Sequence, residues 1–403
     1  MGLSYLRCMD LRQLFLRHIA PTSEEPLALA FERAEGVYIY DMEGRAYMDL
    51  ISGIGVSNIG HSHPRVVEAV QKQASTYMHL MVYGEYVQQP QVGYAHALTK
   101  ALDPSLNCVY WGNSGAEAIE GAFKLAKRST GRTEICSFQG SYHGSTHGAL
   151  SAMGNEHFKR AYRPLLPDHR IMPWADFDSL EQITERTAAV VVECIQAESG
   201  YKVVPPTFLQ ALRDRCRQTG ALLIIDEIQT GFGRTGHLFA HQKAGIVPDI
   251  LCLGKALGGG MPLGAFISSQ ERMQTLATNP MLGHLTTFGG HPVSCAAGWA
   301  SLEVLQESNW LKEVTQKEAF LHTQLGPYSY TGQLSGLGLL LALPLGSFER
   351  VLAVQKDLIQ EGYLTDWFLF ENNALRLAPP LSITLEELSS ACTAIIKAIK
   401  QTL

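Results

Sequence analysis

Apolar and polar positions alternate in blocks from about residue 105 to residue 270, and this pattern predicts a mostly parallel sheet flanked by helices. Short apolar runs are separated by longer amphipathic stretches such as "TFLQALRDRCRQTG". The apolar runs are "TEICSF", "AAVVVECI", "ALLIID", "DILCLG" and "GAFISS". Strands that alternate with helices form parallel sheets covered on both faces. Ligands bind beyond the carboxyl ends of such strands, so the residues after each run are the candidate site residues.

The two ends of the chain follow a different pattern. "GVYIYDMEGRAYMDL" predicts an antiparallel hairpin that turns at Glu43-Gly44, and residues from about 300 onward mix long helices with short strands. We expect a large α/β domain over residues 56–300 and a smaller α+β domain built from residues 1–55 and 301–403. The opening "MGLSYLRCMDLRQLFLRHIA" has apolar residues at roughly helical spacing and predicts a packed N-terminal helix.

Composition narrows the function to small-molecule chemistry. The 403 residues can bury a sizeable core, and 46% hydrophobic with 17% charged residues is typical of a soluble globular protein. A net charge of −6 gives no general attraction to nucleic acid or to anionic membranes, and no apolar run reaches the ~18 residues of a membrane span. Eight cysteines without a CxxC pair indicate reduced thiols in a cytoplasmic protein.

The stretch "LLIIDEIQTGFGRTG" allows two interpretations. Its GxGxxG glycines, Gly231, Gly233 and Gly236, match a dinucleotide loop, but such a loop needs its first glycine directly after a strand, and Asp226 to Thr230 intervene here. A compact loop is therefore favoured, and a nicotinamide oxidoreductase is the distant alternative. Asp226 ends a buried strand, where a carboxylate needs a positive partner. That partner is either Arg234 or a bound cofactor.

A lysine 29 positions after Asp226 favours the cofactor. In "DILCLGKALGGGMP", Lys255 follows another apolar run and precedes a glycine-rich loop. One βα unit separates the two residues, so both lie at the same end of nearby strands. A partly desolvated lysine is a nucleophile that forms Schiff bases, and an aspartate facing a protonated pyridine nitrogen makes that ring an electron sink. Together they indicate pyridoxal 5'-phosphate.

The phosphate of such a cofactor needs a cradle, and "YWGNSGAEAIEGAFKLAKRST" supplies a candidate. Ser114 caps a predicted helix, Glu117 completes a capping box, and Gly115 lets an anion approach free backbone N–H groups. The segment is also compatible with an ordinary well-capped helix.

At this point the sequence resembles the class III aminotransferases, fold-type I pyridoxal-phosphate enzymes that include acetylornithine, ornithine and 4-aminobutyrate aminotransferases. The resemblance covers nearly the whole chain. It rests on "GVYIYDMEGRAYMDLISGIGVSNIGHSHP", "NSGAEAIEGAFKLAK", "SYHGS", "ECIQAESG", "LLIIDEIQTGFGRTG", "LGKALGGGMPLGA", "TTFGGHPVSCAAG" and "LRLAPPL", in this order.

The resemblance implies a role for each matching residue around the cofactor. Lys255 is the Schiff-base lysine and Asp226 the partner of the pyridine nitrogen. Tyr142 stacks on one face of the ring and Ile228 packs on the other. The remaining cofactor residues are Ser114, Gly115 and Ala116 at the phosphate, Gln229 at the ring hydroxyl, His143 beside Tyr142, and Thr287, which reaches the phosphate of the neighbouring subunit of a homodimer.

The family divides on the substrate side. Arg376 matches the arginine that binds the α-carboxylate of glutamate or 2-oxoglutarate, and Glu198 matches the acid that neutralises this arginine while an ω-amino substrate is bound. Without the resemblance, Arg376 reads as a surface strand arginine. Ser145 replaces the arginine that usually binds a second carboxylate, and Ile54 stands where ornithine aminotransferases have tyrosine. These two departures leave the amine donor open.

The resemblance implies a ping-pong aminotransferase that moves the ω-amino group of an ornithine-, acetylornithine- or 4-aminobutyrate-like donor to 2-oxoglutarate. An aminomutase or racemase of the same fold is the alternative, and it would give no net amino transfer. Two histidine pairs, His143 with His147 and His61 with His63, have metal-ligand spacing, but no carboxylate or cysteine accompanies them in their motifs. We expect loop or capping roles for them and no metal.

Overall fold

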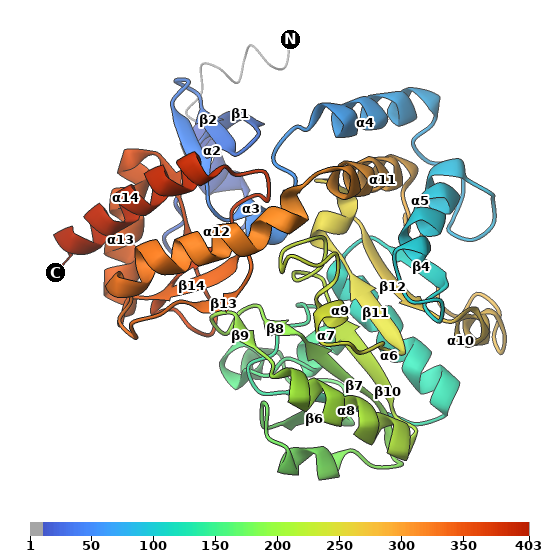
Figure 1. Cartoon of the computed structure of the whole chain (residues 1–403). Coiled ribbons are helices and arrows are strands. Elements are labelled where there is room, and N and C mark those ends of the chain that lie inside the picture. The colour runs from blue at the N-terminus through green and yellow to red at the C-terminus, as the bar shows by residue number, and fades with distance from the viewer. Residues whose placement is uncertain (1–10, 403) are drawn as a thin grey trace.

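The computed structural model describes residues 11–402, and a seven-stranded sheet lies at its centre (Figure 1). The strand order is β4-β12-β11-β10-β7-β5-β6. Strand β12 is antiparallel to both neighbours and the other pairs are parallel, which confirms the predicted mostly parallel sheet. The strands are β4 (Cys108–Gly112), β5 (Glu134–Phe138), β6 (His169–Met172), β7 (Thr187–Glu193), β10 (Leu222–Asp226), β11 (Ile250–Leu253) and β12 (Gly264–Ser268).

The inner strands are apolar on both faces along most of their length, because helices cover both faces of the sheet. Ile224 packs in one cluster with α6 (Gly115–Thr130), whereas Leu223 and Ile225 pack in the other cluster with α8 (Pro206–Thr219). Since side chains alternate along a strand, Asp226 projects on the same face as Ile224, toward α6. Further helices around this sheet are α4 (Pro64–Thr76), α5 (Gln89–Lys100), α7 (His147–Ser151), α9 (Ala240–Lys243), α10 (Gln270–Gln274) and α11 (Pro292–Glu307).

Segments from the two ends of the chain share one small sheet. The predicted hairpin forms strands β2 (Tyr38–Asp41) and β3 (Ala46–Asp49), and Gly44 in its turn has a φ of +83°. Strand β1 (Phe31–Glu35) pairs with β2, and β15 (Tyr363–Leu364) pairs in parallel with β3. The blue N-terminal strands therefore lie beside the orange and red C-terminal helices in Figure 1. The boundaries at residues 55 and 300 stay a prediction.

The C-terminal part adds a second four-stranded sheet, of order β13-β14-β17-β16. Its strands are β13 (Ser335–Leu337), β14 (Leu340–Pro344), β16 (Asp366–Trp367) and β17 (Ala374–Leu377), and its helices are α12 (Trp310–Leu325), α13 (Phe348–Glu361) and α14 (Leu385–Gln401). A short hairpin of β8 (Ile195–Gln196) and β9 (Lys202–Val203) extends from the central sheet toward β13.

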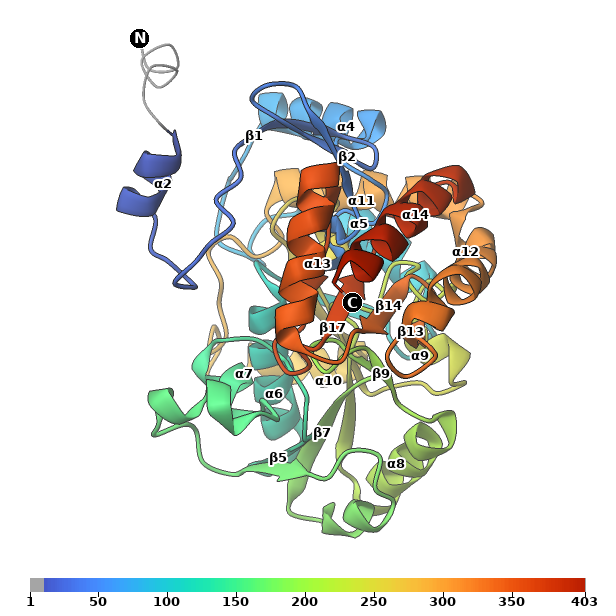
Figure 2. The same ribbon diagram turned by 90° about the vertical axis from the view of Figure 1, so that its left-hand side faces the viewer.

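The prediction of a packed N-terminal helix is only half correct. Residues Leu11–His18 form helix α2, but none of them is buried, and Phe15 and Leu16 are exposed. Figure 2 shows α2 standing away from the rest of the chain. Helical spacing of apolar residues predicts a helix, but it does not predict whether the apolar face of that helix packs against the rest of this chain. Residues 1–10 of the predicted helix lie outside the described residues.

All seven described cysteines are free, and six of them are buried. Within residues 11–402, no helix combines the length and apolar character that a membrane crossing requires.

Candidate active site

A pocket of about 330 Å³ lies at the carboxyl ends of the parallel strands, where the fold predicts a ligand. Strands β7, β10 and β11 end at its floor, and the N-terminus of α6 forms one wall. Eight of the predicted site residues line it: Gly115, Ala116, Tyr142, His143, Asp226, Ile228, Gln229 and Lys255. Its other lining residues are Gly144, Ser145, Glu193, Ala197 and Thr230.

Lys255 presents a reactive amine to this pocket. It follows β11 after Gly254 and adopts a left-handed backbone with a φ of 50°. Burial lowers the pKa of its ammonium from the ordinary value; the carboxylate of Glu198 acts against this, and the guanidinium of Arg376 adds to it. Lys255 Nζ has no hydrogen-bond partner among the described residues, so the amine is free to react with a bound carbonyl.

Asp226 lies at the end of β10, the strand beside β11, as the spacing to Lys255 predicts. It is 4% exposed, its Oδ2 lies 2.8 Å from His143 Nδ1, and its Oδ1 accepts a hydrogen bond from Ile228 N at 3.0 Å. Burial acts to lower the pKa of His143, but the hydrogen bond and charge of Asp226 raise it. The alternative partner is wrong, since Arg234 donates to Ala378 O at 3.1 Å instead.

The N-terminus of α6 is capped, but not by the predicted capping box. Ser114 Oγ accepts from Glu117 N at 3.2 Å as expected, yet Glu117 Oε2 accepts from the backbone and side-chain nitrogens of Asn113, at 2.8 and 2.9 Å. Asn113 offers two donors and so captures the carboxylate. The first N–H groups of a helix lack intrahelical partners, which leaves those of Gly115 and Ala116 for an anion.

Glycines allow three segments to meet at this point. A Cβ on Gly264 would lie 2.0 Å from Ser114 O, and one on Gly115 would lie 2.9 Å from the side chain of Ile228. Side chains at these positions would push β12 and the loop after β10 away from the helix N-terminus. The close approach of these segments gives the phosphate wall its shape.

Gln229 is held by a strained turn at the mouth of the pocket. Its Nε2 donates to Ile54 O at 3.2 Å, and its Oε1 is buried with no partner among the described residues. Residues Ser52–Gly55 all have positive φ, and Ile54 has a φ of 61°, which is uncommon for a β-branched residue. Ile54 is half-buried and, although predicted as a substrate residue, does not line the pocket.

Arg376 and Glu198 form a buried ion pair beside the pocket rather than in its wall. Arg376 lies on β17, is 2% exposed, and its Nη2 lies 2.6 Å from Glu198 Oε2. The guanidinium also lies 4.4 Å from the centre of the Phe368 ring. The interpretation of Arg376 as a surface strand arginine is therefore wrong. Burial acts to lower the pKa of Arg376, but Tyr201 and Glu198 outweigh it and raise that pKa.

Comparison with known proteins places this site in a family. The family model described as "Aminotransferase class-III" matches residues 19–399. The acetylornithine aminotransferase of Methanopyrus kandleri is 37% identical over 97% of this chain and 99% of its own length, and that of Bacillus subtilis is 37% identical over 91% and 94%. This chain belongs to the class III aminotransferases.

A solved structure agrees with this assignment. An ornithine aminotransferase of Toxoplasma gondii, whose structure is described as having partial occupancy of PLP at the active site, superposes with a TM-score of 0.91 at 28% identity, covering 99% of this chain and 97% of that one. Class III aminotransferases depend on pyridoxal phosphate. The pocket fits that group, because Lys255 Nζ, Gln229 Oε1 and His143 Nε2 all lack partners among the described residues.

Glu193 is the pocket residue of this aminotransferase that the sequence reasoning missed. It ends β7 at the register position of Asp226 on β10, so it stands in the row of strand-end residues where ligands bind. The sequence signal that could have identified it is the glutamate near the end of the apolar run "AAVVVECI". Thr287, by contrast, is exposed and lies outside the pocket.

The other motifs have structural roles in this aminotransferase. The GxGxxG segment forms turns rather than the start of a long helix, as the compact-loop interpretation predicts. Glu227 fixes the start of this segment, because its backbone O accepts from Gly231 N at 3.1 Å and its carboxylate accepts from His241 N at 2.8 Å and His241 Nδ1 at 2.6 Å. His61 Nε2 lies 2.7 Å from Asp49 Oδ2. Within residues 11–402, no three histidine, cysteine or acidic side chains gather as a metal site would require.

Proposed function

We propose that this aminotransferase holds pyridoxal phosphate in the 330 Å³ pocket and moves the ω-amino group of a small amine to 2-oxoglutarate by a ping-pong cycle. One observation carries the proposal: an unpartnered Lys255 opens onto the same pocket as the Asp226–His143 pair, beside the buried Arg376–Glu198 pair. The first two features suit the cofactor, and the third suits two different substrates.

Four side chains hold the reacting ring in this proposal. Pyridoxal phosphate supplies an electron sink that stabilises negative charge on the substrate carbon. Asp226, oriented by His143, keeps the pyridine nitrogen protonated, and at ~4 Å and an effective dielectric of ~20 such a charge pair is worth roughly 4 kcal/mol. Tyr142 and Ile228 cover the two faces of the ring, and the N-terminus of α6 receives the phosphate.

Lys255 moves the proton. Once the substrate amine has taken its place on the cofactor, Lys255 Nζ accepts the proton from the substrate carbon and returns it to complete the transfer. The lowered pKa of Lys255 suits this role, because an amine that releases its proton more readily works better as a base and can then return the proton as an acid.

The Arg376–Glu198 pair admits both substrates in turn. An amine donor that reacts at its ω-end brings no carboxylate to Arg376, and Glu198 then neutralises the guanidinium. When 2-oxoglutarate enters, its α-carboxylate replaces Glu198 and forms a bidentate pair with Arg376. The guanidinium of Arg376 therefore keeps a carboxylate partner in both half-reactions, which use one pocket.

The donor we propose is an ω-amine of the ornithine, acetylornithine or 4-aminobutyrate kind, and the first two are named for the relatives. Ser145 lies at the exposed edge of the pocket, and its Oγ is 3.1 Å from the Tyr142 hydroxyl. A donor carboxylate at this edge meets hydroxyl groups rather than a cation.

Ser145→Arg should lower the KM for acetylornithine roughly tenfold, because a charged hydrogen bond replaces a neutral one. An unchanged KM would place the donor carboxylate elsewhere.

A homodimer is part of the proposal. Exposed apolar side chains gather on two adjacent loops, with Met81 and Tyr86 on one and Met281 and Phe288 on the other. His79 and Phe288 rings lie 5.1 Å apart, which joins the loops into one surface. A second copy covering this surface would bring Thr287 toward a neighbouring pocket. We place the assembly in the cytoplasm, in keeping with its free cysteines.

Lysine replacement tests the proposed chemistry. Lys255→Ala should lower turnover at least about a thousandfold, because it removes both the nucleophile and the proton carrier. Lys243→Ala, at an exposed position on α9, is the matched control and should keep the wild-type rate. Turnover near the wild-type rate in the Lys255 variant would overturn the assignment.

A further inference from the structure

Glu193 is a buried carboxylate that the proposed chemistry leaves without a role. It is 5% exposed, ends β7 in register with Asp226, and lies on the pocket side of the sheet. It has no cation of its own among its hydrogen-bond partners in the described part of the chain. A buried carboxylate is costly unless its oxygens accept hydrogen bonds, so its two partners identify what it stabilises.

The two oxygens of Glu193 hold two separate loops. Oε1 accepts from Tyr142 N at 2.9 Å, and Oε2 accepts from Ala197 N at 2.8 Å. Tyr142 belongs to the loop after β5 and forms a wall of the cofactor pocket. Ala197 immediately precedes Glu198, the partner of Arg376. One carboxylate therefore fixes a wall of the cofactor site and the segment that carries the substrate-switching acid.

We propose that Glu193 is a positioning residue that sets the Tyr142 wall and the Glu198–Arg376 pair in a fixed relation to each other. This inference rests on the proposed function for the identity of the two half-reactions. The anchoring of the two loops by Glu193 is independent of the proposed function, because both hydrogen bonds join residues of this chain and involve no cofactor or substrate.

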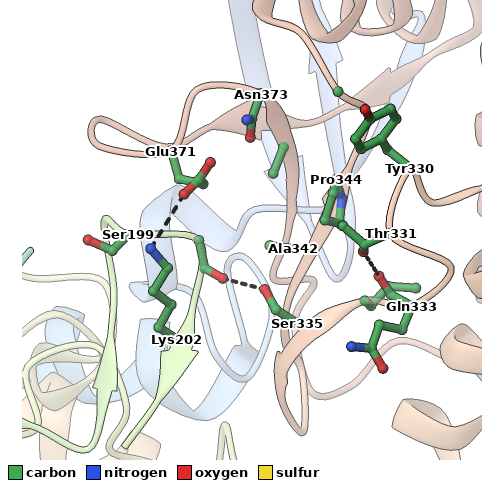
Figure 3. A pocket seen from close by; sticks show the side chains of 14 residues that line it. Ser199, Lys202, Tyr330, Thr331, Gln333, Ser335, Ala342, Pro344, Glu371 and Asn373 are labelled. Carbon is green, nitrogen blue, oxygen red and sulfur yellow. Dashed lines mark hydrogen bonds and ion pairs between the residues drawn. The ribbon is translucent and has the colours of Figure 1, made fainter. Parts of the chain in front are cut away.

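The segment after Glu198 is held from its outer side as well. A cavity of about 420 Å³ separates it from the C-terminal sheet (Figure 3). Lys202 Nζ lies 3.5 Å from Glu371 Oε2, and Ser335 Oγ donates to Gly200 O. Glu198 thus stands between an inner anchor at Glu193 and an outer anchor on the C-terminal part. The C-terminal part also holds Glu198 directly, because Glu198 O accepts from Phe370 N at 3.0 Å and its Oε2 accepts from Leu369 N at 3.2 Å. We therefore expect that loss of the inner anchor shifts the segment without unfolding it.

The charges around Glu193 agree with this role. Burial raises the pKa of Glu193 to about 7, the neighbouring His143 acts against this and Asp226 adds to it, and the N–H groups of Ala197 and Tyr142 favour the ionised form. The carboxylate is electrostatically tolerated only because these N–H groups and His143 face it. Asp226 belongs to the same cluster, so the charge of Asp226, the proposed partner of the ring, affects the pKa of Glu193.

Hydrogen exchange of the cofactor-free chain tests the geometry directly. In Glu193→Gln the amide oxygen accepts one N–H and the amide nitrogen opposes the other, so exchange of the peptides containing Tyr142 and Ala197 should accelerate roughly tenfold. Glu134→Gln is the control: Glu134 is similarly buried and bonded to Thr187, but it lies at the start of β5, beside the start of β7 and away from the pocket. Unaltered exchange at both peptides in the Glu193 variant would overturn the proposal.

Kinetics test the consequence. The KM for 2-oxoglutarate should rise roughly tenfold in Glu193→Gln while the maximal rate of the amine half-reaction changes less, because the oxo acid must displace Glu198. Glu134→Gln should move neither constant. Equal effects on both half-reactions would mean that Glu193 is merely structural. If Glu193→Gln does not fold, Glu193→Asp, whose carboxylate is too short to reach both loops, takes its place.

Failure of the proposed function is distinguishable from failure of this inference. A wild-type enzyme that transfers no amino group to 2-oxoglutarate would contradict the function. The exchange measurement on the cofactor-free chain would still decide whether Glu193 anchors Tyr142 and Ala197.

Discussion

Single residues at the strand ends decide the chemistry of this molecule. Asp226 is an ionisable group at the end of a buried strand, and the sequence identified it because a carboxylate at that place needs a positive partner. What the sequence did not show is that His143, rather than a cation, is its protein partner. A loop residue 83 positions away comes next to Asp226 only through the packing of β5, β7 and β10.

Replacing Asp226 tests the ring-partner role. Asp226→Asn keeps the shape but removes the negative charge, which at ~4 Å and an effective dielectric of ~20 is worth roughly 4 kcal/mol. We expect turnover to fall by about a hundredfold or more, measured in steady state with saturating cofactor. His147→Ala, at an exposed position close to the site, should have little effect. A fully active Asp226→Asn variant would contradict the pairing.

The pH dependence of stability tests Glu193 in the absence of cofactor. Its folded pKa is raised from 4.5 to about 7, so its contribution to stability is present below pH 4.5 and is lost as the pH rises to about 7. We expect the melting temperature of the wild type to decrease over that window, and to decrease less in Glu193→Gln. Calorimetry at several pH values checks this. Parallel profiles for the two proteins would contradict the raised pKa.

At the scale of elements, the strands and the main helices could be predicted, because a covered sheet requires apolar runs. Each of the five predicted runs contains a strand, and "TFLQALRDRCRQTG" lies within α8 and its glycine cap. Local details could not be predicted where several residues compete for the same hydrogen-bond partner or where distant residues make the contact. Asn113 displaced the predicted capping box at α6, and the left-handed turn around Ile54 depends on distant contacts with Gln229.

The prediction at the scale of elements concerns Gly115, the glycine at the start of α6, and the binding of the cofactor phosphate. Gly115→Ala places a methyl group 2.9 Å from Ile228, so the phosphate wall must open. We expect the dissociation constant for pyridoxal phosphate to rise roughly tenfold, because the helix N–H groups move away from the phosphate. A fluorescence titration of the cofactor-free chain measures it.

Gly131→Ala is the matched control, at the left-handed C-cap of the same helix. It should destabilise the protein by about 1 kcal/mol and leave cofactor affinity unchanged. Equal affinities for all three proteins would show that the N-terminus of α6 does not hold the phosphate.

At the scale of the whole molecule, the pairing of β3 with β15 joins residues more than 300 positions apart, so segments from both ends of the chain share one sheet. Sequence patterns indicated that both ends share one region but not how they pair. Packing of α2 could not be predicted either, since an exposed amphipathic helix and a buried one have the same periodicity.

The prediction at the scale of the whole molecule concerns the exposed apolar loops and the oligomeric state. Phe288 is 54% exposed and Met281 73% exposed, and large apolar patches of this kind are typical of interfaces. Phe288→Asp should convert the proposed dimer into monomers, seen by sedimentation, and lower the activity with it. Leu352→Asp, an exposed leucine on α13, should leave the dimer intact. A dimeric Phe288 variant would place the interface elsewhere.

The most direct test of the account is the visible absorbance spectrum of the purified protein, taken before and after L-glutamate is added without any oxo acid. We expect a yellow protein that bleaches, because glutamate, bound through Arg376, transfers its amino group to the cofactor held at Lys255. A yellow protein indifferent to glutamate would contradict the role of Arg376 and favour an aminomutase or racemase, and a colourless protein that glutamate leaves unchanged even after pyridoxal phosphate is supplied would contradict the cofactor site itself.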